Sequence, residues 1–84
     1  MSCSMYIVKS EIADRYYIGS AVDVDKRIAI HNSGRARWTR RYQPWVLVHT
    51  EQYATRGEAI TRERFLKKLK GIGRHLDEIR RGHL

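Results

Sequence analysis

Two short runs of β-branched and aromatic residues near the amino terminus constrain the fold of this chain more than any other feature. Residues 5–8 form the first run and residues 15–19 the second, and each carries a candidate site tyrosine, Tyr6 or Tyr17. Because only a short turn separates the runs, an antiparallel hairpin is their simplest connection. Side chains alternate across a strand, so Tyr17 and Gly19 share one face of the second strand.

The chain has 84 residues, which leaves room for one hydrophobic core, so we expect a single domain over residues 1–84. Hydrophobic residues make up 42% of it and charged residues 31%, a balance typical of folded rather than disordered chains. Its single cysteine, Cys3, cannot form a disulfide within the chain. The longest apolar run, residues 46–48, is far too short to span a bilayer, and no signal peptide is recognisable. We therefore expect a cytoplasmic protein without membrane contact.

The segment after the hairpin carries the start and stop signals of a helix. Asp23 is a suitable N-cap residue and Gly34 a suitable stop. Four side chains between them follow the spacing that places residues on one helical face: Val24, Arg27, Ile28 and His31. Two of the four are apolar and should pack against the core. Arg27 and His31 on the same inward face require a chemical explanation.

Residues 45–49 are almost continuously apolar and rich in β-branched or aromatic side chains. Such a run is typical of a strand buried on both faces, so the pattern predicts a strand at the centre of the sheet. Pro44 precedes the run and suits the loop that leads into it, because proline cannot donate to a ladder of backbone hydrogen bonds.

The last third of the chain predicts two helices. Thr55 and Glu58 form a capping box at the start of a helix that we expect to span about residues 56–70. Its apolar stripe consists of Ala59, Ile60, Leu66 and Leu69. Glu63 lies within that stripe, where a carboxylate is costly unless it is paired or binds a metal. A shorter helix over about residues 73–81 should dock through its apolar side chains, which are Ile72, Leu76 and Ile79.

The chain carries 17 lysines and arginines against 9 aspartates and glutamates, a formal net charge of +8. So strong a positive field points to polyanionic partners, chiefly nucleic acid, because cationic side chains displace counterions from the phosphate backbone. Four arginines in a loop over residues 33–44 are expected to contact nucleic acid: Arg35, Arg37, Arg40 and Arg41. Trp38 and Tyr42 alternate with them and either stack on bases or pack into the protein core.

Three motifs in this chain resemble those of the GIY-YIG nuclease superfamily. Tyr6-Ile7 and Tyr17-Ile18-Gly19 resemble the paired strand motifs from which that superfamily is recognised. Residues 25–34, with Arg27 followed by His31, resemble the arginine helix of the family. Residues 63–67 resemble the segment that carries its metal-binding glutamate.

The resemblance is strongest to the small standalone bacterial branch, which is similar to the N-terminal nuclease domain of bacterial excinuclease. That branch typically shows a histidine-asparagine-x-glycine turn, an aromatic-threonine pair and a proline before the central strand, as do residues 31–34, Trp38-Thr39 and Pro44 here. The resemblance covers about residues 5–70. The first strand motif departs from the family pattern, because Ser4-Met5 replaces its glycine and isoleucine.

The resemblance implies an α/β (α+β) fold with a small three-stranded antiparallel sheet flanked by three helices. It also implies a divalent-metal-dependent endonuclease, with Glu63 binding one Mg²⁺ or Mn²⁺ ion and Arg27 contacting the scissile phosphate of DNA. Tyr17 is then the candidate general base, and Tyr6 positions the water or Tyr17. Because a tyrosine hydroxyl ordinarily has a pKa near ~10, base chemistry at neutral pH implies the field of the metal and Arg27. His31 holds a phosphate or shares in proton transfer.

Two other functions stay open on the sequence alone. They are a non-catalytic nucleic-acid-binding module and a partner-recruiting module on the same fold. The presence of Tyr17, Arg27 and Glu63 favours the enzyme, and the four histidines together with Cys3 lack the ligand spacing of a zinc site. The pattern leaves open the form of the DNA, or RNA, that is cut, the oligomeric state and whether a protein partner supplies specificity. The expected setting is DNA repair or processing.

Overall fold

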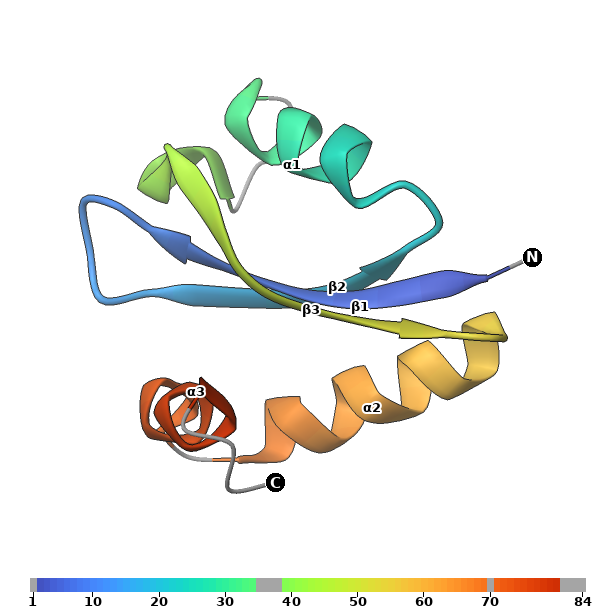
Figure 1. The fold of residues 1–84 in the computed structure, drawn as a ribbon. Coiled ribbons are helices and arrows are strands. Elements are labelled where there is room, and N and C mark those ends of the chain that lie inside the picture. Colours follow the sequence, from blue (N-terminus) through green and yellow to red (C-terminus); the bar gives the residue numbers. More distant parts are fainter. Residues whose placement is uncertain (1, 35–38, 70, 81–84) are drawn as a thin grey trace.

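A computed structural model of the chain describes residues 2–34, 39–69 and 71–80, with side chains of the last helix described through residue 77. Within these residues, the strands and helices follow one another in the order that Figure 1 shows. Their bounds are β1 Cys3–Ser10, β2 Tyr16–Ala21, α1 Val24–Asn32, the 3₁₀ helix η1 Thr39–Tyr42, β3 Trp45–Tyr53, α2 Arg56–Lys68 and α3 Ile72–Arg80. No helix in this described part of the chain is both long and apolar enough to cross a membrane.

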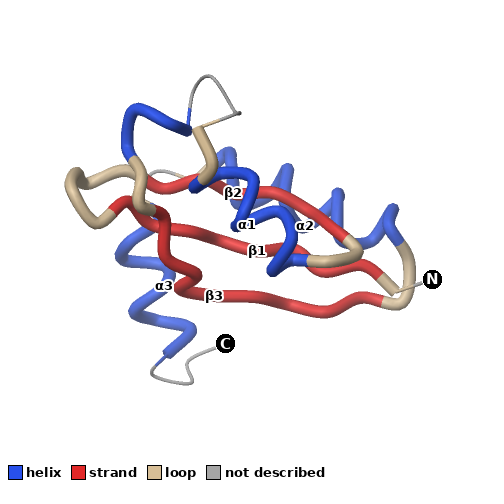
Figure 2. The backbone as a smooth tube through the Cα atoms, turned by 90° about the horizontal axis from the view of Figure 1, so that it is seen from above, coloured by secondary structure: helices blue, strands red, loops and turns tan. Residues whose placement is uncertain are grey.

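The strands form one antiparallel sheet in the order β2-β1-β3. Helix α1 covers one face of the sheet, and α2 and α3 cover the other (Figure 1). Seen from above, the three strands lie side by side with α1 on the near side (Figure 2). The expected α+β fold, a three-stranded antiparallel sheet flanked by three helices, is therefore confirmed for the described residues.

Strand β1 lies between the other two and supplies the core on both faces of the sheet. Its middle residues are fully buried: Met5, Tyr6, Ile7 and Val8. Alternation along the strand sends every second side chain to the same face. The core under α2 and α3 contains Met5, Ile7, Ile18, Leu66 and Leu76. The core under α1 contains Tyr6, Val8 and Trp45.

The prediction that residues 45–49 form the central strand is wrong, because β3 lies at an edge of the sheet. Val46 and Leu47 are 42% and 38% exposed. Trp45 packs into the core under α1 and Val48 packs under α2, as alternation along a strand requires for residues three positions apart. The apolar run thus supplies single residues to each core, while Val46 and Leu47 between them stay exposed at the edge of the sheet.

Helices α1 and α2 begin at the predicted caps. The Asp23 side chain accepts a hydrogen bond from the third backbone N–H of the helix at 3.1 Å, and Thr55 does the same for Glu58 at 3.2 Å. Both caps satisfy donors that a helix leaves unpaired at its start. Helix α2 ends at Lys68, slightly earlier than expected. Gly71 then takes a φ of 72°, a left-handed conformation that suits glycine, and turns the chain into α3.

Candidate active site

Tyr6 and Gly19 are paired across β1 and β2, and this pair sets the geometry of the candidate site. The Tyr6 side chain is fully buried. A Cβ atom on Gly19 would stand 2.6 Å from Tyr6 Oη, closer than real Cβ atoms come to any neighbour. The bare backbone of Gly19 therefore makes the room that the Tyr6 hydroxyl occupies at the edge strand of the sheet.

His31 on α1 meets the Tyr6 hydroxyl. The Nε2 atom lies 3.0 Å from Tyr6 Oη, and Nδ1 lies 3.1 Å from Oγ1 of Thr39. The imidazole is 4% exposed. Burial, and then the nearby charge of Arg27, lower the pKa of His31 below its ordinary value. The ring is therefore neutral at pH 7, and one of its nitrogens donates while the other accepts.

Tyr17 packs beside these two residues as a half-buried side chain. Its ring centroid lies 4.6 Å from that of His31 and 6.4 Å from that of Tyr6. The Lys67 Nζ atom lies 5.9 Å from the centroid of the Tyr17 ring. Tyr6, Tyr17 and His31 thus form one ring cluster under α1, with a cation from α2 at its side.

Arg27 reaches the ring cluster from an exposed position on α1. Burial raises the pKa of Tyr6, and this effect outweighs the hydrogen bond and positive charge of Arg27, which lower it. The same positive charge acts on His31. An exposed arginine close enough to Tyr6 to act on its pKa can also receive a phosphate from solution.

Glu63 lies on α2, which covers the opposite face of the sheet, and its charge acts on Tyr6 of the ring cluster. Its Oε1 accepts a hydrogen bond from Ser20 Oγ at 2.6 Å, and its Oε2 accepts one from Lys67 Nζ at 2.6 Å. Burial raises the pKa of Glu63, but the hydrogen bonds from Lys67 and Ser20 outweigh it and hold the pKa below its ordinary value. The carboxylate is thus ionised at neutral pH, and its charge is among the influences that raise the pKa of Tyr6.

Ser20 and Lys67 are the two site residues that sequence reasoning missed. The contact of Lys67 could have been predicted from the sequence, because Lys67 follows Glu63 at the i, i+4 spacing that brings side chains together on a helix. Ser20 carried no such signal, since it faces away from Gly19 and meets Glu63 only when α2 packs on that face. The site wraps around β2 and brings together all the predicted catalytic residues: Tyr6, Tyr17, Arg27, His31 and Glu63.

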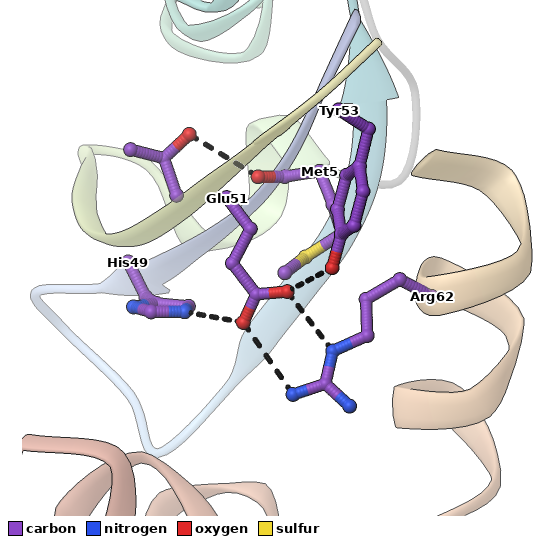
Figure 3. A network of polar contacts seen from close by, with 6 residues as sticks. Met5, His49, Glu51, Tyr53 and Arg62 are labelled. Atoms are coloured by element: carbon purple, nitrogen blue, oxygen red, sulfur yellow. Dashed lines mark hydrogen bonds and ion pairs between the residues drawn. The ribbon is translucent and has the colours of Figure 1, made fainter. Parts of the chain in front are cut away.

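A second polar network fixes the turn of α2 that presents Glu63 (Figure 3). Arg62, the preceding residue, donates from Nε to Glu51 Oε1 at 2.9 Å and from Nη2 to Oε2 at 3.4 Å. The Tyr53 hydroxyl and His49 Nε2 donate to the same carboxylate at 2.5 and 2.8 Å. Because Arg62 binds β3 while Glu63 binds β2, helix α2 is held to both edge strands of the sheet.

Only part of the predicted nucleic-acid-binding loop can be located. Arg35 and Arg37 lie outside the described residues. Arg40 and Arg41 lie in η1 with exposed side chains. Trp45 Nε1 donates to the backbone oxygen of Thr39 at 2.6 Å, which ties η1 to β3. Binding of nucleic acid by these arginines stays a prediction.

The donor set at Glu63 fits a hard divalent cation. Its side chain is 18% exposed and carries a negative charge. Among the residues that the structure describes, no three His, Cys, Asp or Glu side chains are grouped so that they could hold a metal by themselves. One carboxylate suits Mg²⁺ or Mn²⁺, because such ions accept oxygen ligands and keep several waters that a substrate phosphate can replace.

Comparison with known proteins places these features in a family. A family model described as the GIY-YIG catalytic domain matches residues 2–76. A UPF0213 protein of Streptococcus pneumoniae is 39% identical over 67 residues, which are 79% of this chain and 67% of that protein. A UPF0213 protein of Halobacterium salinarum is 44% identical over 55 residues, or 64% and 71% of the two chains. The solution NMR structure of a UPF0213 protein from Bacillus halodurans matches with a TM-score of 0.54 and 33% identity, covering 89% of this chain and 80% of that one.

Proposed function

This chain belongs to the GIY-YIG catalytic-domain family, and from that premise we propose that it is a divalent-metal-dependent endonuclease that hydrolyses phosphodiester bonds of DNA. The GIY-YIG domain is a nuclease domain and is generally metal-dependent. The observation that carries the proposal is the gathering of tyrosine, arginine and carboxylate groups around β2. Hydrolysis of a phosphodiester needs a positioned water, a base and relief of negative charge on the phosphoryl oxygens.

We assign Tyr17 as the general base. In this scheme a water oxygen bonds to phosphorus, its proton passes to the deprotonated Tyr17 oxygen, and the bond between phosphorus and the leaving oxygen breaks. Two cations lie close to Tyr17: Lys67, whose Nζ lies 5.9 Å from the ring centroid, and Arg27, which acts on the neighbouring Tyr6 and His31. The raised pKa of Tyr6 suits a hydroxyl that stays protonated, and because Tyr6 is fully buried we assign it to position Tyr17 rather than the water.

We assign His31 to act through Tyr6 rather than on the phosphate. Both of its ring nitrogens are engaged, with Tyr6 and Thr39, and the ring is almost completely buried. A neutral imidazole held in this way orients the Tyr6 hydroxyl, because a hydrogen-bonded chain fixes which group donates. These contacts argue against the phosphate-holding role inferred from the sequence and favour a positioning role of His31 through Tyr6.

We assign Arg27 to the scissile phosphate and Glu63 to the metal. The guanidinium donates to phosphoryl oxygens and stabilises the charge that develops there. Ser20 and Lys67 orient the ionised Glu63 carboxylate. When bound there, a Mg²⁺ or Mn²⁺ ion supplies charge relief to the phosphate and the leaving oxygen.

DNA is the proposed substrate, with RNA as the alternative polyanion. The net charge of +8 supports either, because phosphate contacts do not depend on base sequence. We propose that the form of the nucleic acid or a protein partner supplies the specificity. The proposed setting is DNA repair or processing in the cytoplasm.

The deciding experiment replaces Glu63 by Gln and measures melting temperature, DNA affinity and cleavage with Mg²⁺ or Mn²⁺. The change removes the charge that would bind the metal. It also removes the ion pair with Lys67, whose side chain is 49% exposed, and such a pair contributes at most about 1 kcal/mol to the stability of the fold. We expect a folded protein that binds DNA but does not cut it. Asp77→Asn removes one exposed carboxylate from α3 and should cut as the wild type does.

Two further variants separate the assigned roles. Tyr17→Phe should lose cleavage with little change in DNA affinity, whereas Arg27→Ala should lose both because it removes a phosphate contact. Metal-dependent cleavage by folded Glu63→Gln would contradict the mechanism. A wild-type protein that binds DNA but cuts it with neither metal would instead be a non-catalytic binding module.

A further inference from the structure

A cleft next to the candidate active site brings cationic side chains of two helices together. The cleft has a volume of ≈ 280 Å³, and its lining includes Lys26 and Arg27 from α1 and Arg56 from the start of α2. These helices cover opposite faces of the sheet (Figure 1), and the cleft lies at the carboxyl end of β2, beside the start of each helix. The lining also includes Ser20, whose hydroxyl binds Glu63, so the cleft adjoins the proposed metal ligand.

Lys26 and Arg56 have charges that the rest of the described structure leaves unneutralised. Both are exposed, and the ion pairs found among the described residues involve Glu51 or Glu63 and other cations. The acidic member of the cleft lining is Asp23, and its Oδ1 already accepts the backbone N–H of Lys26 as the helix cap. With three cationic side chains and one carboxylate in its lining, the hollow carries a net positive charge and is favourable for an anion.

We propose that this cleft is a second phosphate site, which binds a phosphodiester of the substrate strand adjacent to the one that is cut. The proposal rests on the proposed nuclease function and adds to it the path that the substrate strand of nucleic acid follows across the protein. Arg27 both lines the cleft and reaches the ring cluster, so it connects the two phosphate positions. A volume of ≈ 280 Å³ is near the lower limit of ligand pockets, which suits one phosphate and its sugar.

The position of the cleft also defines how a strand would lie along α1. Helix α1 has nine residues and is therefore about 13 Å long. Lys26 lies in its amino-terminal half, while η1 joins its other end through the bond between His31 and Thr39. Exposed Arg40 and Arg41 in η1 would then contact the same strand beyond the cut. The substrate is held on both sides of the scissile phosphate.

The test neutralises the cleft and compares it with an equal loss of charge elsewhere. Lys26→Gln/Arg56→Gln is matched by Lys68→Gln/Arg74→Gln, which removes two exposed cations from α2 and α3. Affinity for a short DNA duplex is measured in chelator, so that metal-dependent cleavage does not interfere. We expect the cleft variant to bind at least about fivefold more weakly and to lose about 0.9–1.8 from the slope of log affinity against log salt. The control should change less than about twofold, since it loses no phosphate contact.

A scan of the DNA identifies the phosphate concerned. Each phosphodiester in turn is replaced by an uncharged methylphosphonate, and both the wild type and the cleft variant are titrated. One or two positions next to the cut should weaken the wild type several-fold but leave the cleft variant unaffected, because the two changes remove the same contact. Equal weakening by both double variants, or the lack of any such position, would overturn the second site.

These outcomes separate the second site from the nuclease function. A wild type that cuts DNA, with both double variants equally weakened, retains the function and loses the second site. A wild type that never cuts, but shows the coupling between the cleft and one phosphate, retains the site and loses the function. Failure of the wild type to bind DNA or RNA would overturn both.

Discussion

At the scale of single residues, each position of the run Tyr17-Ile18-Gly19 contributes differently to the structure. Tyr17 joins the ring cluster, Ile18 is 7% exposed and packs into the core under α2, and Gly19 leaves space for Tyr6. The order of these tasks follows from strand alternation, which sends the first and third side chains to one face and the second to the other. A change at each position should therefore damage a different property of the protein.

Gly19→Ala is expected to fold but to lose cleavage. The new methyl group would stand 2.6 Å from Tyr6 Oη, so Tyr6 must move and its hydrogen bond to His31 is lost. Overpacking of this kind typically destabilises a core by about 1–3 kcal/mol. The measurements are chemical denaturation and metal-dependent cleavage of DNA.

Gly57→Ala is the matched control for this prediction. A Cβ at Gly57 would meet its nearest neighbour at 4.0 Å, and alanine is favoured over glycine in a helix by up to about 1 kcal/mol. The control should therefore be as stable as the wild type or slightly more so, with full cleavage. If Gly19→Ala cut DNA as fast as the wild type, the placement of the Tyr6 side chain would not be required for cleavage.

At the scale of elements, α2 is the helix whose placement decides the site. Arg62 binds Glu51 on β3, and Glu63 binds Ser20 on β2. Burial alone raises the pKa of Glu51, but the hydrogen bonds from Tyr53, His49 and Arg62 outweigh it and lower the pKa from 4.5 to about 2. The ionised Glu51 carboxylate thus stabilises the contact between α2 and β3, and the helix that carries Glu63 depends on it.

The stability supplied by Glu51 should depend on pH in a defined range. In the folded protein the pKa of Glu51 is about 2, whereas its ordinary value is 4.5. The stability that this lowered pKa supplies is therefore complete above pH 4.5 and is lost as the pH falls toward 2. At neutral pH, Glu51→Gln should lower the free energy of unfolding by about 1–3 kcal/mol. Denaturation at several pH values should show the gap between the variant and the wild type shrinking below pH 4.5.

Glu11→Gln makes the same substitution at an exposed position in the turn between β1 and β2. Its unfolding free energy should follow that of the wild type across this pH range. A gap between Glu51→Gln and the wild type that stays constant down to about pH 2 would show that the carboxylate charge is not what stabilises α2.

At the scale of the whole molecule, charge is the dominant property. A net charge of +8 on 84 residues attracts polyanions from a distance and accelerates their encounter. Exposed cations lie near both ends of α1, at Lys26 and at Arg40 and Arg41. The shape of the fold therefore distributes positive charge along the helix that carries Arg27.

DNA affinity should fall steeply with salt. If about four phosphates are contacted, raising the salt from about 50 to 200 mM should weaken binding on the order of 100-fold, because bound counterions are no longer released as favourably. Fluorescence anisotropy with a labelled duplex measures this dependence. Near-constant affinity over the same range would favour a partner-recruiting role, in which the charge is incidental.

Features that arise from residues close together in the chain could be predicted from the amino-acid sequence alone. Strand alternation and the short turn predicted the hairpin, and the side chains of Asp23 and Thr55 predicted where two helices begin. These interactions reach over a few residues, so a local pattern contains all of their partners. The motif tyrosines, Arg27 and Glu63 could be selected as candidates for the same reason, since each breaks or completes a local pattern.

Features that join residues far apart in the chain became visible only in the folded structure. Residues 45–49 have the apolar pattern of a central strand, yet β1 is central because it pairs with a strand on each side. Ser20 and Glu63 are 43 positions apart, and no local pattern predicts that a carboxylate on one side of an edge strand acts through its charge on a tyrosine on the other side. The convergence of Lys26 and Arg56 on one cleft has the same origin. Packing of two helices on opposite faces of a small sheet creates it, and that packing is a property of the whole fold.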